Sequence, residues 1–554
     1  MGRNKTARQH SFAIIPDRSK PRSKFRMKQT RKMGFNASDL IPIMCEEVLP
    51  GDTWQHRESL FARLATPIAP LVDDLDIETW YFYVPLRILN EDWEDFITGV
   101  DTDLTVPKIA PNGTTGMARS VPEGSVFDHF GIPPAASYDS SFAVNAYPIW
   151  SYFTIWNEWY RDQNLQAEYT WSTTPLTGSE NITNGTTQWD CMPLRVNKRS
   201  DYFTRSLPWP QKGAAVALPL TGNAPVITAS SDLVTGAQNP LRVLNATNGN
   251  AVTQLTLGTN TSNVKALGTV DYSTGTNVYP SNLEADLSAV TAATINALRL
   301  AAITQQMLEL DARGGSRYVE NLLAHWSVRA SNRSLQRPEY LGGSRVPITI
   351  NPIAQTAAYD AEPAMDPSAV GNLGAEMHAS GNKRTFTYAA EEHGYIIGLA
   401  AVRATPTYQQ GLRRHWTRSV RLDFWDPLFA GLGEQAVNTV EIYQPANNAP
   451  TNATWGFQER GAEYRYTPNE ITGPLRSTAT LPLDWWHLAE EFGNEPALNA
   501  SFITDKTKEI LGRCLAIDTT TSEQWSCQII MDILHDSTVA RMMPAYSVPG
   551  ITTF

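Results

Sequence analysis

The chain of 554 residues carries 45 Lys and Arg against 56 Asp and Glu, a formal net charge of −11, with 35 Gly, 36 Pro and 16 Trp. Only 18% of the residues are charged and 42% are hydrophobic, which excludes a disordered chain or a helical bundle and favours a loop-rich globular protein with a large core. No run of eighteen apolar residues and no apolar N-terminal signal segment occur, so we expect no membrane insertion and no secretion by the usual route.

The positive charge is concentrated at the N-terminus. Residues 1–33 hold eleven Lys and Arg and one acid, Asp17, a charge of +10. The body of residues 34–554 keeps the remaining 34 Lys and Arg against 55 Asp and Glu, a charge of −21. Because such an asymmetry is typical of an interaction tail, we predict a basic N-terminal arm over residues 1–33.

The arm has a two-residue period. In "KPRSKFRMKQTRK", residues 20–32, a cation stands at every second position from residue 20 to residue 28. An extended backbone places these cations on one side, about 6.6 Å apart, which suits a flexible polyanion, and an aromatic ring between them offers a base a stacking surface. The alternative is that the arm lies along a neighbouring subunit and pairs with its acidic body. The predicted DNA-facing or inter-subunit residues are Arg18, Lys20, Arg22, Lys24, Phe25, Arg26, Lys28, Arg31 and Lys32.

The body alternates short apolar or aromatic runs with Pro, Gly, Asn and Asp, the pattern of a β-sandwich with long connections. In "DIETWYFYVPLRIL" both alternating sets of side chains are bulky, which predicts a central strand covered on both faces and ending at Pro85. Further predicted strands are "RTFTYAA" from Arg384, "YIIGLAAVRA" from Tyr395 and "VRLDFW" from Val420.

Two helices are predicted. Aromatic and apolar residues recur at three- and four-residue spacing from Ile149 to Tyr160, which indicates a helix with one aromatic stripe. Ser281 and Glu284 fit a capping box, an apolar face follows and two glycines end it, so we predict a long helix over about 283–312.

The composition changes abruptly over residues 214–281. This segment of 68 residues holds four charges, no Trp, Phe, Met, Cys or His, and abundant Thr, Asn, Gly and Ala. Because connections longer than about 15 residues are uncommon inside compact domains, we predict an insertion with its own β structure or a functional surface loop. A disordered linker is the alternative. The insertion divides the core into a first part, residues 34–213, and a second part, residues 282–554.

A catalytic signature is absent from the sequence. There is no Walker A sequence, no G-x-G-x-x-G after a strand, no G-x-S-x-G elbow and no metalloprotease motif. "DWWHLAEEF" places Glu490 and Glu491 beside tryptophans, as in a glycosidase, yet two adjacent acids on a helix point to different sides. We therefore predict no enzyme, cofactor or metal site, with a β-rich carbohydrate-binding or carbohydrate-active protein as the alternative. The four cysteines lack zinc-ligand spacing and are predicted to be reduced, buried thiols: Cys45, Cys191, Cys514 and Cys527.

A second basic stretch, "LRRHWTRSVR" at residues 412–421, combines arginines with an indole ring. A subunit interface and a nucleic-acid contact explain it equally well. The interface candidates are Arg413, Arg414, Trp416 and Arg418.

Many strings, in chain order, resemble the major capsid protein of gokushoviruses, small single-stranded DNA phages of the Microviridae. The resemblance runs from about residue 10 to the C-terminus. Among the matching strings are "EEVLPGDTW", "WYFYVPLRILNEDWEDFITG", "IWNEWYRDQNL", "DYFTRSLPWPQKG", "SLQRPEYLGG", "EHGYIIGLA", "YQQGLRRHW", "ERGAEYRY" and "MPAYSVPG".

The resemblance implies both a fold and a function. The expected fold is mainly β, an eight-stranded antiparallel jelly roll with long inserted loops and a few helices. The expected function is that of a virion protein, assembled in the cytoplasm of a bacterial host, whose pentamers form a T=1 icosahedral shell around circular single-stranded DNA. By position, residues 214–281 are similar to the variable protrusion at the three-fold axes that meets a host receptor. A small basic DNA-packaging protein and a pilot protein are expected partners.

Overall fold

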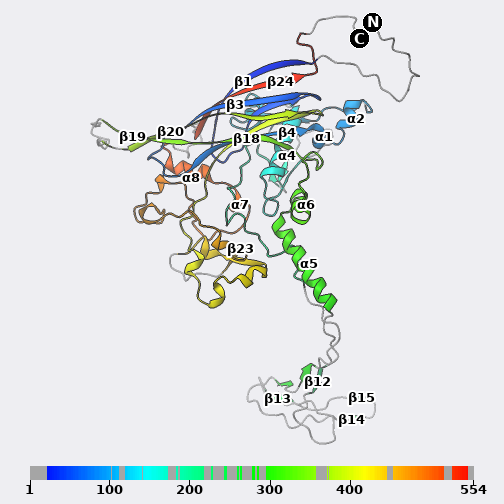
Figure 1. The fold of residues 1–554 in the computed structure, drawn as a ribbon, viewed down its shortest axis with the longest axis vertical. Helices are drawn as coiled ribbons and strands as arrows, with labels where there is room; N and C mark the ends of the chain where they lie inside the picture. Colours follow the sequence, from blue (N-terminus) through cyan, green and yellow to red (C-terminus); the bar gives the residue numbers. More distant parts are fainter. Residues whose placement is uncertain are drawn as a thin grey trace, which may run out of the picture. The chain divides into compact units, whose positions relative to one another are not determined.

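The computed structural model describes residues 22–101, 103–111, 119–139, 141–171, 182–184, 187–216, 295–356, 371, 373–445, 453–516 and 527–546, with short strands between residues 226 and 285. The chain forms two compact units, one of Met1–Pro210 with Asp311–Phe554 and one of Gln211–Leu310. The larger unit contains the two main sheets. The first has the strand order β1-β24-β3-β20-β19 and the second the order β18-β4-β21-β2 (Figure 1).

The strands of the first sheet are β1 (Ser23–Phe35), β24 (Ile529–Arg541), β3 (Thr53–Leu64), β20 (Leu373–Ala389) and β19 (Thr349–Ala354). Those of the second sheet are β18 (Glu339–Pro347), β4 (Leu75–Pro85), β21 (Gly394–Ala404) and β2 (Ile41–Val48).

Eight of these strands pair in a nested, antiparallel order. The first pairs with the last, β1 with β24; the second with the seventh, β2 with β21; the third with the sixth, β3 with β20; and the fourth with the fifth, β4 with β18. Two further pairings, β24 with β3 and β21 with β4, join these ribbons into two sheets. A long hairpin wrapped in this way is a jelly roll, and β19 adds a ninth strand beside β20. The predicted fold class is confirmed.

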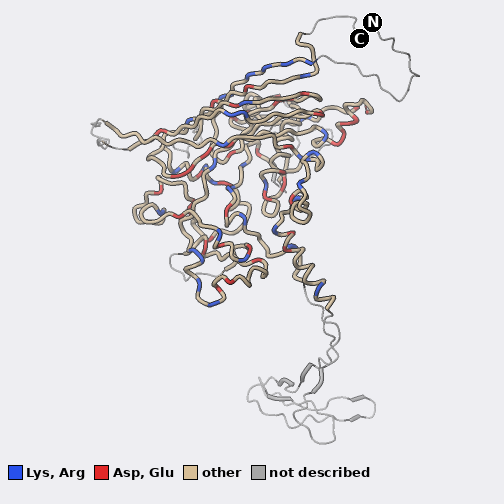
Figure 2. Tube along the Cα trace, viewed as in Figure 1, with Lys and Arg blue, Asp and Glu red and all other residues tan. Residues whose placement is uncertain are grey.

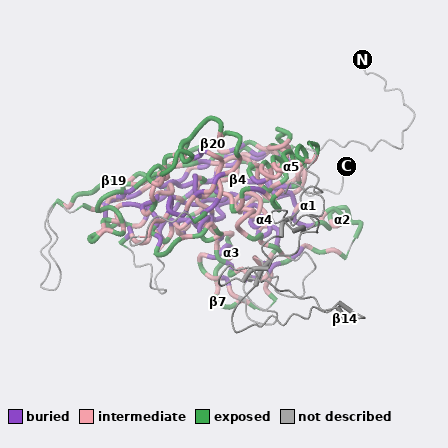
Figure 3. Tube along the Cα trace, turned by 90° about the horizontal axis from the view of Figure 1, so that it is seen from below, coloured by how far each residue is buried: buried purple, intermediate pink, exposed green. Residues whose placement is uncertain are grey.

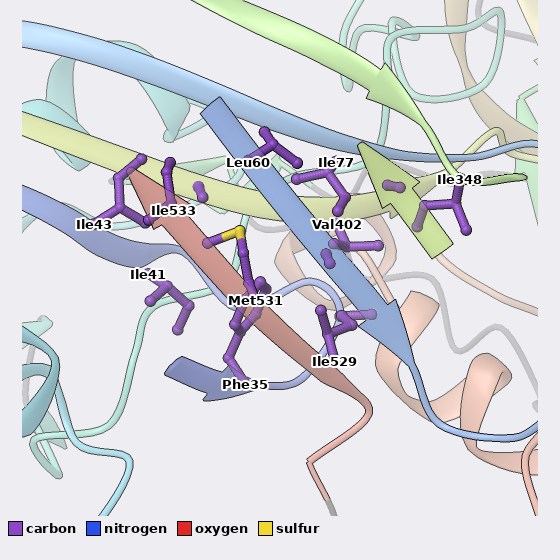
Figure 4. Packing of buried hydrophobic residues seen from close by; sticks show 14 of the residues in the cluster. Phe35, Ile41, Ile43, Leu60, Ile77, Ile348, Val402, Ile529, Met531 and Ile533 are labelled. Atoms are coloured by element: carbon purple, nitrogen blue, oxygen red, sulfur yellow. The ribbon is translucent and has the colours of Figure 1, made fainter. Parts of the chain in front are cut away.

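The inward-facing side chains of both sheets form the main core. Every second residue of β3 and β24 is buried while the residues between them are half-buried or exposed, as a strand with one covered face requires. Figure 4 shows the side chains that meet in this core from both sheets, among them Phe35, Ile41, Ile43, Leu60, Ile77, Ile348, Val402, Ile529, Met531 and Ile533.

Strand β4 is covered on both faces, as predicted. All its residues are buried except Trp80, which is half-buried, and it ends at Pro85. Its second face contributes to another core with α4 (Tyr147–Ile155), which continues into a π-helical turn at Trp156–Tyr160. The predicted aromatic helix is thereby confirmed. Figure 3 shows β4 within the buried interior and β19 at the exposed margin.

The remaining helices of the larger unit are short. They are α1 (Leu86–Leu89), α2 (Trp93–Thr98), α3 (Val126–Phe130), α6 (Tyr318–Trp326), α7 (Ala500–Ile503) and α8 (Thr507–Cys514). The minor strands are β5 (Lys108–Ile109), β6 (Arg119–Val121), β7 (Ala135–Tyr138), β8 (Val144–Asn145), β9 (Tyr169–Thr170), β10 (Thr183–Asn184), β11 (Thr187–Gln188), β22 (Glu434–Asn438) and β23 (Thr454–Glu459).

The smaller unit has β structure of its own, as predicted for the insertion. Its six short strands also pair in nested order, β12 with β17, β13 with β16 and β14 with β15. Their bounds are β12 (Val226–Thr228), β13 (Val243–Asn245), β14 (Thr259–Asn260), β15 (Asn263–Val264), β16 (Val278–Pro280) and β17 (Leu283–Ala285).

The start of the predicted long helix and the strand predicted from Val420 are wrong. The helix predicted over 283–312 is α5 (Ile295–Gly314), and Leu283–Ala285 is a strand instead. The local capping pattern is overridden there by pairing with the β-branched residues of β12. The strand predicted from Val420 is a 3₁₀ turn at Arg421–Asp423, because the Asp423 carboxylate accepts hydrogen bonds from the backbone amides of Ser419 and Val420.

None of the four cysteines forms a disulfide, and they are buried or half-buried. Burial raises the pKa of the Cys514 thiol to about 11 and that of Cys45 to about 12. The prediction of buried thiols is confirmed for Cys191 and Cys514, whereas Cys45 and Cys527 are half-buried. The raised pKa values keep the Cys45 and Cys514 sulfurs protonated and weakly reactive.

A chain of polar groups crosses the main core. The Nε2 atom of His535 lies 3.0 Å from the carbonyl oxygen of Ile43, which only accepts, so this nitrogen carries the proton. The other ring nitrogen of His535 then accepts from Nε2 of His56, 3.4 Å away, and Nδ1 of His56 accepts from the hydroxyl of Ser537 at 2.8 Å. Burial lowers the pKa of His56 to about 3 and that of His535 to about 4, so both rings are neutral in the folded protein.

A buried carboxylate lies beside these rings. Glu58 accepts hydrogen bonds from the Tyr81 hydroxyl at 2.7 Å, from the Thr79 hydroxyl at 3.0 Å and from the Ser344 hydroxyl. Hydroxyl donors from β4 and β18 therefore solvate this acid of β3, which ties the two sheets together through the core.

The neutral histidines predict a pH-dependent stability. Because the folded-state pKa of His535 is below its ordinary value of 6.5, its contribution to stability is complete above pH 6.5 and is lost as the pH falls toward about 4. In His535→Gln the free energy of unfolding is lower than in the wild type at pH 7, and this gap is about 2 kcal/mol smaller at pH 5. Urea unfolding followed by tryptophan fluorescence measures the gap. A constant gap for His535→Gln between pH 7 and pH 5 would contradict the neutral ring.

Candidate nucleic-acid face and subunit contacts

The last third of the predicted arm, from Ser23, is part of a strand of the body. All thirteen residues of β1, Ser23 to Phe35, pair with β24, so the boundary between arm and body falls before Ser23 and not after residue 33. Met27 and Met33 pack against the main core and Phe35 is buried. The extended conformation and its two-residue period agree with the sequence, but the strand has its own chain as partner.

Strand β1 presents its lysines outward. Lys24, Arg26, Lys28 and Lys32 are all exposed, and Figure 2 shows Lys and Arg recurring along this strand at the edge of the sheet. Within the described part of the chain, the three lysines form no ion pair. Charged residues on an edge strand also oppose unwanted strand pairing, which is the purely structural explanation of this row.

The remaining arm candidates have other surroundings. Arg22 donates to the carbonyl oxygen of Gly51 at 2.7 Å and to the Thr53 hydroxyl at 2.5 Å, which fastens the start of β1. Arg31 is half-buried on the inward side, where burial lowers the pKa of its guanidinium. Phe25 is half-buried on that same side, so its position does not favour a base-stacking role. Arg18 and Lys20 lie outside the described residues.

Cross-strand neighbours extend the cationic row over the sheet. Lys28 stands opposite Asp536, which stands opposite Arg57, and Arg57 stands opposite Arg384. Residues directly opposite one another share a face, so this row lies on the outward face of β1, β24, β3 and β20. Arg63 adds another exposed cation and forms an ion pair with Glu376 at 3.5 Å.

We refer to this outward surface as the cationic sheet face. It carries seven exposed cations and three acids, a charge of +4, in a chain with a net charge of −11. The rows between the charges hold threonine, serine, asparagine and glutamine side chains in the centre, and the apolar residues Leu534, Phe61 and Ile530 toward one end of the face. The cations are Lys24, Arg26, Lys28, Lys32, Arg57, Arg63 and Arg384, and the acids are Glu376, Asp532 and Asp536.

Asp536 organises the centre of the cationic sheet face. It accepts a bidentate pair from Arg26, with Nε at 2.9 Å and Nη2 at 2.6 Å from its oxygens. The hydrogen bonds from Arg26, together with the charges of Lys28 and Arg57, lower the pKa of Asp536. Arg26 of β1 is thus held against Asp536 of β24, while the neighbouring lysines remain available to a ligand.

Sequence reasoning missed the arginines of β3 and β20. The signal for β3 was present in "TWQHRESLFARL", where buried residues alternate with Arg57 and Arg63 at a period of two. Arg384 follows the same pattern only up to a bulge that shifts the register between Arg384 and Phe386.

The arginines of the second basic stretch serve the fold. Arg413 pairs with Glu470, Arg414 donates to the carbonyl oxygen of Ala436 at 2.8 Å, and Arg418 lies 3.3 Å from Glu463. The side chains of Arg413, Arg414 and Arg418 therefore each bind a partner within this chain. The indole ring of Trp416 is exposed.

The carboxylates beside the tryptophans also have internal partners. Glu490 is buried and accepts from Lys198 at 2.5 Å and from Lys506 at 2.8 Å, while Glu491 is exposed, and neither lies on a helix. The helix assumed for this pair is therefore wrong. Among the described residues, no three His, Cys, Asp or Glu side chains gather as metal ligands, and no helix has the length and apolar character that a membrane span needs.

A jelly roll with long insertions belongs to the class of β-sandwiches found in viral capsid and lectin domains. Residues 13–551 match the family described as capsid protein (F protein), and this chain belongs to that family. It is 39% identical over 558 residues to the capsid protein VP1 of Bdellovibrio phage phiMH2K, covering 98% of both chains. It is 34% identical to that of Chlamydia phage 1 over 603 residues, covering 98% of this chain and 97% of the relative. It is also 35% identical to that of Spiroplasma virus 4, covering 98% of both chains. The chain is thus a structural capsid protein of the virion and not an enzyme.

The pairing of β1 predicts that two N-terminal truncations differ. Removal of residues 1–35 deletes β1 and exposes the edge of β24 and the apolar side chains beneath it, so the protein loses solubility. Removal of residues 2–21 leaves β1 in place, and the protein stays folded. Soluble yield and circular dichroism measure both effects, and a soluble, folded chain lacking residues 1–35 would contradict the role of β1.

Proposed function

We propose that this capsid protein assembles through pentamers into a closed T=1 icosahedral shell around circular single-stranded DNA, with the cationic sheet face turned toward the genome. The observation that carries this proposal is the +4 charge of that face within a chain of net charge −11. The residues outside this face carry a net charge of −15 (−11 − 4), so its positive charge is not a property of the chain as a whole.

The two sheets differ in what covers them. The outward face of the second sheet packs against α4 and its aromatic core, with Phe82 and Leu399 buried there. The cationic sheet face has no such covering among the described residues, and its cations are exposed. It is therefore the open sheet surface that a ligand can reach.

The chemistry of the cationic sheet face fits non-specific phosphate binding. The outward lysines of β1 stand four residues apart, about 13 Å along the strand, with Arg26 between the first two, and their flexible side chains adapt to a single strand of DNA. Hydroxyl and amide side chains in the intervening rows add hydrogen-bond donors to phosphate or sugar. The described part of this face consists of strands, with no helix placed to read base edges, so the binding is indifferent to sequence.

Neutralising the free lysines of β1 tests the proposal. In the triple variant Lys24→Gln, Lys28→Gln and Lys32→Gln, single-stranded DNA binds more weakly at low salt. The slope of log affinity against log salt becomes shallower by about 2, since each phosphate contact on a single strand contributes about 0.7. Fluorescence anisotropy with a mixed-sequence oligonucleotide at several salt concentrations measures both quantities.

The matched control removes three exposed cations outside the cationic sheet face, Lys108→Gln, Arg299→Gln and Arg329→Gln. The total charge changes equally in both variants, so a general effect of net charge lowers both slopes alike. Equal slopes for the two variants would contradict the proposal that the cationic sheet face binds DNA.

We also propose that residues 214–281 form a protrusion at the three-fold axes that contacts a host receptor, with a small basic DNA-packaging protein and a pilot protein as further virion partners. The low charge and the Thr- and Asn-rich composition of this segment support a solvated surface role. Its described strands pair with one another or, in the case of β12, with β17 just after the segment, and none of them pairs with a described strand of the two main sheets. Sequence change in this insertion therefore leaves the pairing of the jelly roll intact.

Replacement of residues 214–281 by a short Gly-Ser linker separates attachment from assembly. We expect particles of normal size that adsorb at least tenfold less to host cells, because the jelly-roll pairings do not involve this segment. Sedimentation measures the particles and loss of free phage from the medium measures adsorption. Unchanged adsorption would contradict the attachment role.

A further inference from the structure

A loop outside the two sheets exposes many large apolar side chains. Seven of them fall within residues 416–432, and their exposed fractions range from 41% to 86%. We name this stretch the apolar surface segment. Its exposed side chains are Trp416, Val420, Leu422, Phe424, Trp425, Leu428 and Leu432.

The exposed area is large for a free surface. At about 200 Å² for a large side chain, these fractions correspond to roughly 800–900 Å² of apolar surface. The largest apolar patch on a typical monomer measures about 300–600 Å². A standard protein interface buries about 800 Å² on each partner. The apolar surface segment therefore has the area that one side of a stable interface requires.

The backbone of this segment is held in place by its own protein. Asp423 accepts from the amides of Ser419 at 2.8 Å and Val420 at 2.9 Å, and Asp426 accepts from the amide of Leu428 at 2.9 Å. The carbonyl oxygen of Leu422 accepts a hydrogen bond from the guanidinium of Arg460 at 3.2 Å. Because these hydrogen bonds already fix the backbone of the segment, little conformational entropy is lost when its apolar side chains bind a partner.

The charges around the apolar surface segment are largely balanced. Arg414 lies 3.4 Å from Glu441 and Arg418 lies 3.3 Å from Glu463, while Arg413 pairs with Glu470. Paired guanidinium groups attract DNA only weakly, so this surface differs from the cationic sheet face. Its chemistry fits an apolar protein surface and not a nucleic acid.

We propose that the apolar surface segment is one side of a contact between two copies of this chain in the shell. The inference rests on the proposed function, since a shell supplies a second copy at a fixed orientation. Its area matches one partner's share of a stable interface, and its aromatic and leucine side chains are typical of interface centres. The proposed occupant is therefore another copy of this chain and not a minor virion protein.

Assembly of a charged variant tests this contact. In Leu422→Asp with Leu428→Asp we expect a folded protein, unchanged in circular dichroism and in single-stranded DNA binding, whose yield of sedimenting particles falls at least tenfold. The control Val72→Asp changes an exposed apolar residue outside the segment and forms particles normally. If the wild type forms particles and the double variant forms them equally well, the proposed contact is contradicted and the proposed function is not. Failure of the wild type itself to form particles would contradict the proposed function and the contact with it.

Cross-linking identifies the occupant. With the photoreactive residue of the substitution Leu428→p-benzoylphenylalanine, irradiated particles yield a covalent dimer of this chain, mapped by mass spectrometry. A cross-link to a different virion protein, or the absence of any cross-link in intact particles, would overturn the proposal.

Discussion

The pairing of β1 with β24 is the constraint on which the rest of the structure depends. It joins thirteen residue pairs from the two ends of the chain, with Arg26 and Asp536 separated by 510 positions. The same pairing is the outermost turn of the nested hairpin, and the inner pairings β2 with β21, β3 with β20 and β4 with β18 lie within it. Insertions such as the smaller unit therefore enter between strands without changing the order of the sheets.

The alternation of β1 gives one strand two functions. Its inward residues, including Met27, Met33 and Phe35, complete the main core, while its lysines stand on the outward face. A strand can separate apolar and cationic groups in this way because successive side chains point to opposite faces. Part of the positive charge near the N-terminus is thus placed on the outward face of one sheet. Arginines of β3 and β20 extend this row of cations across the sheet.

Local patterns predicted much of this structure. The doubly covered strand ending at Pro85, the strand from Tyr395 and the aromatic helix around Phe153 all carry periodic signals within a dozen residues. The jelly roll itself was inferred from resemblance, since the nested order depends on contacts between residues hundreds of positions apart. The incorporation of β1 into the body was missed because its partner is near the other end of the chain, and charge alone indicated a free arm. The turn at Arg421–Asp423 was missed because one aspartate replaces the strand partner of the backbone amides. The exposed apolar residues around it resembled a strand in sequence, but exposure is decided by the tertiary structure.

The central claim is that the cationic sheet face lines the interior of the shell. An icosahedral cryo-electron microscopy reconstruction of DNA-filled particles, at a resolution that separates the strands, tests it most directly. The account predicts that β1, β24, β3 and β20 form the inner surface, with genome density beside Lys24, Lys28 and Lys32. A reconstruction in which this face points to the outside of the particle, or borders a subunit contact with no DNA nearby, would contradict it.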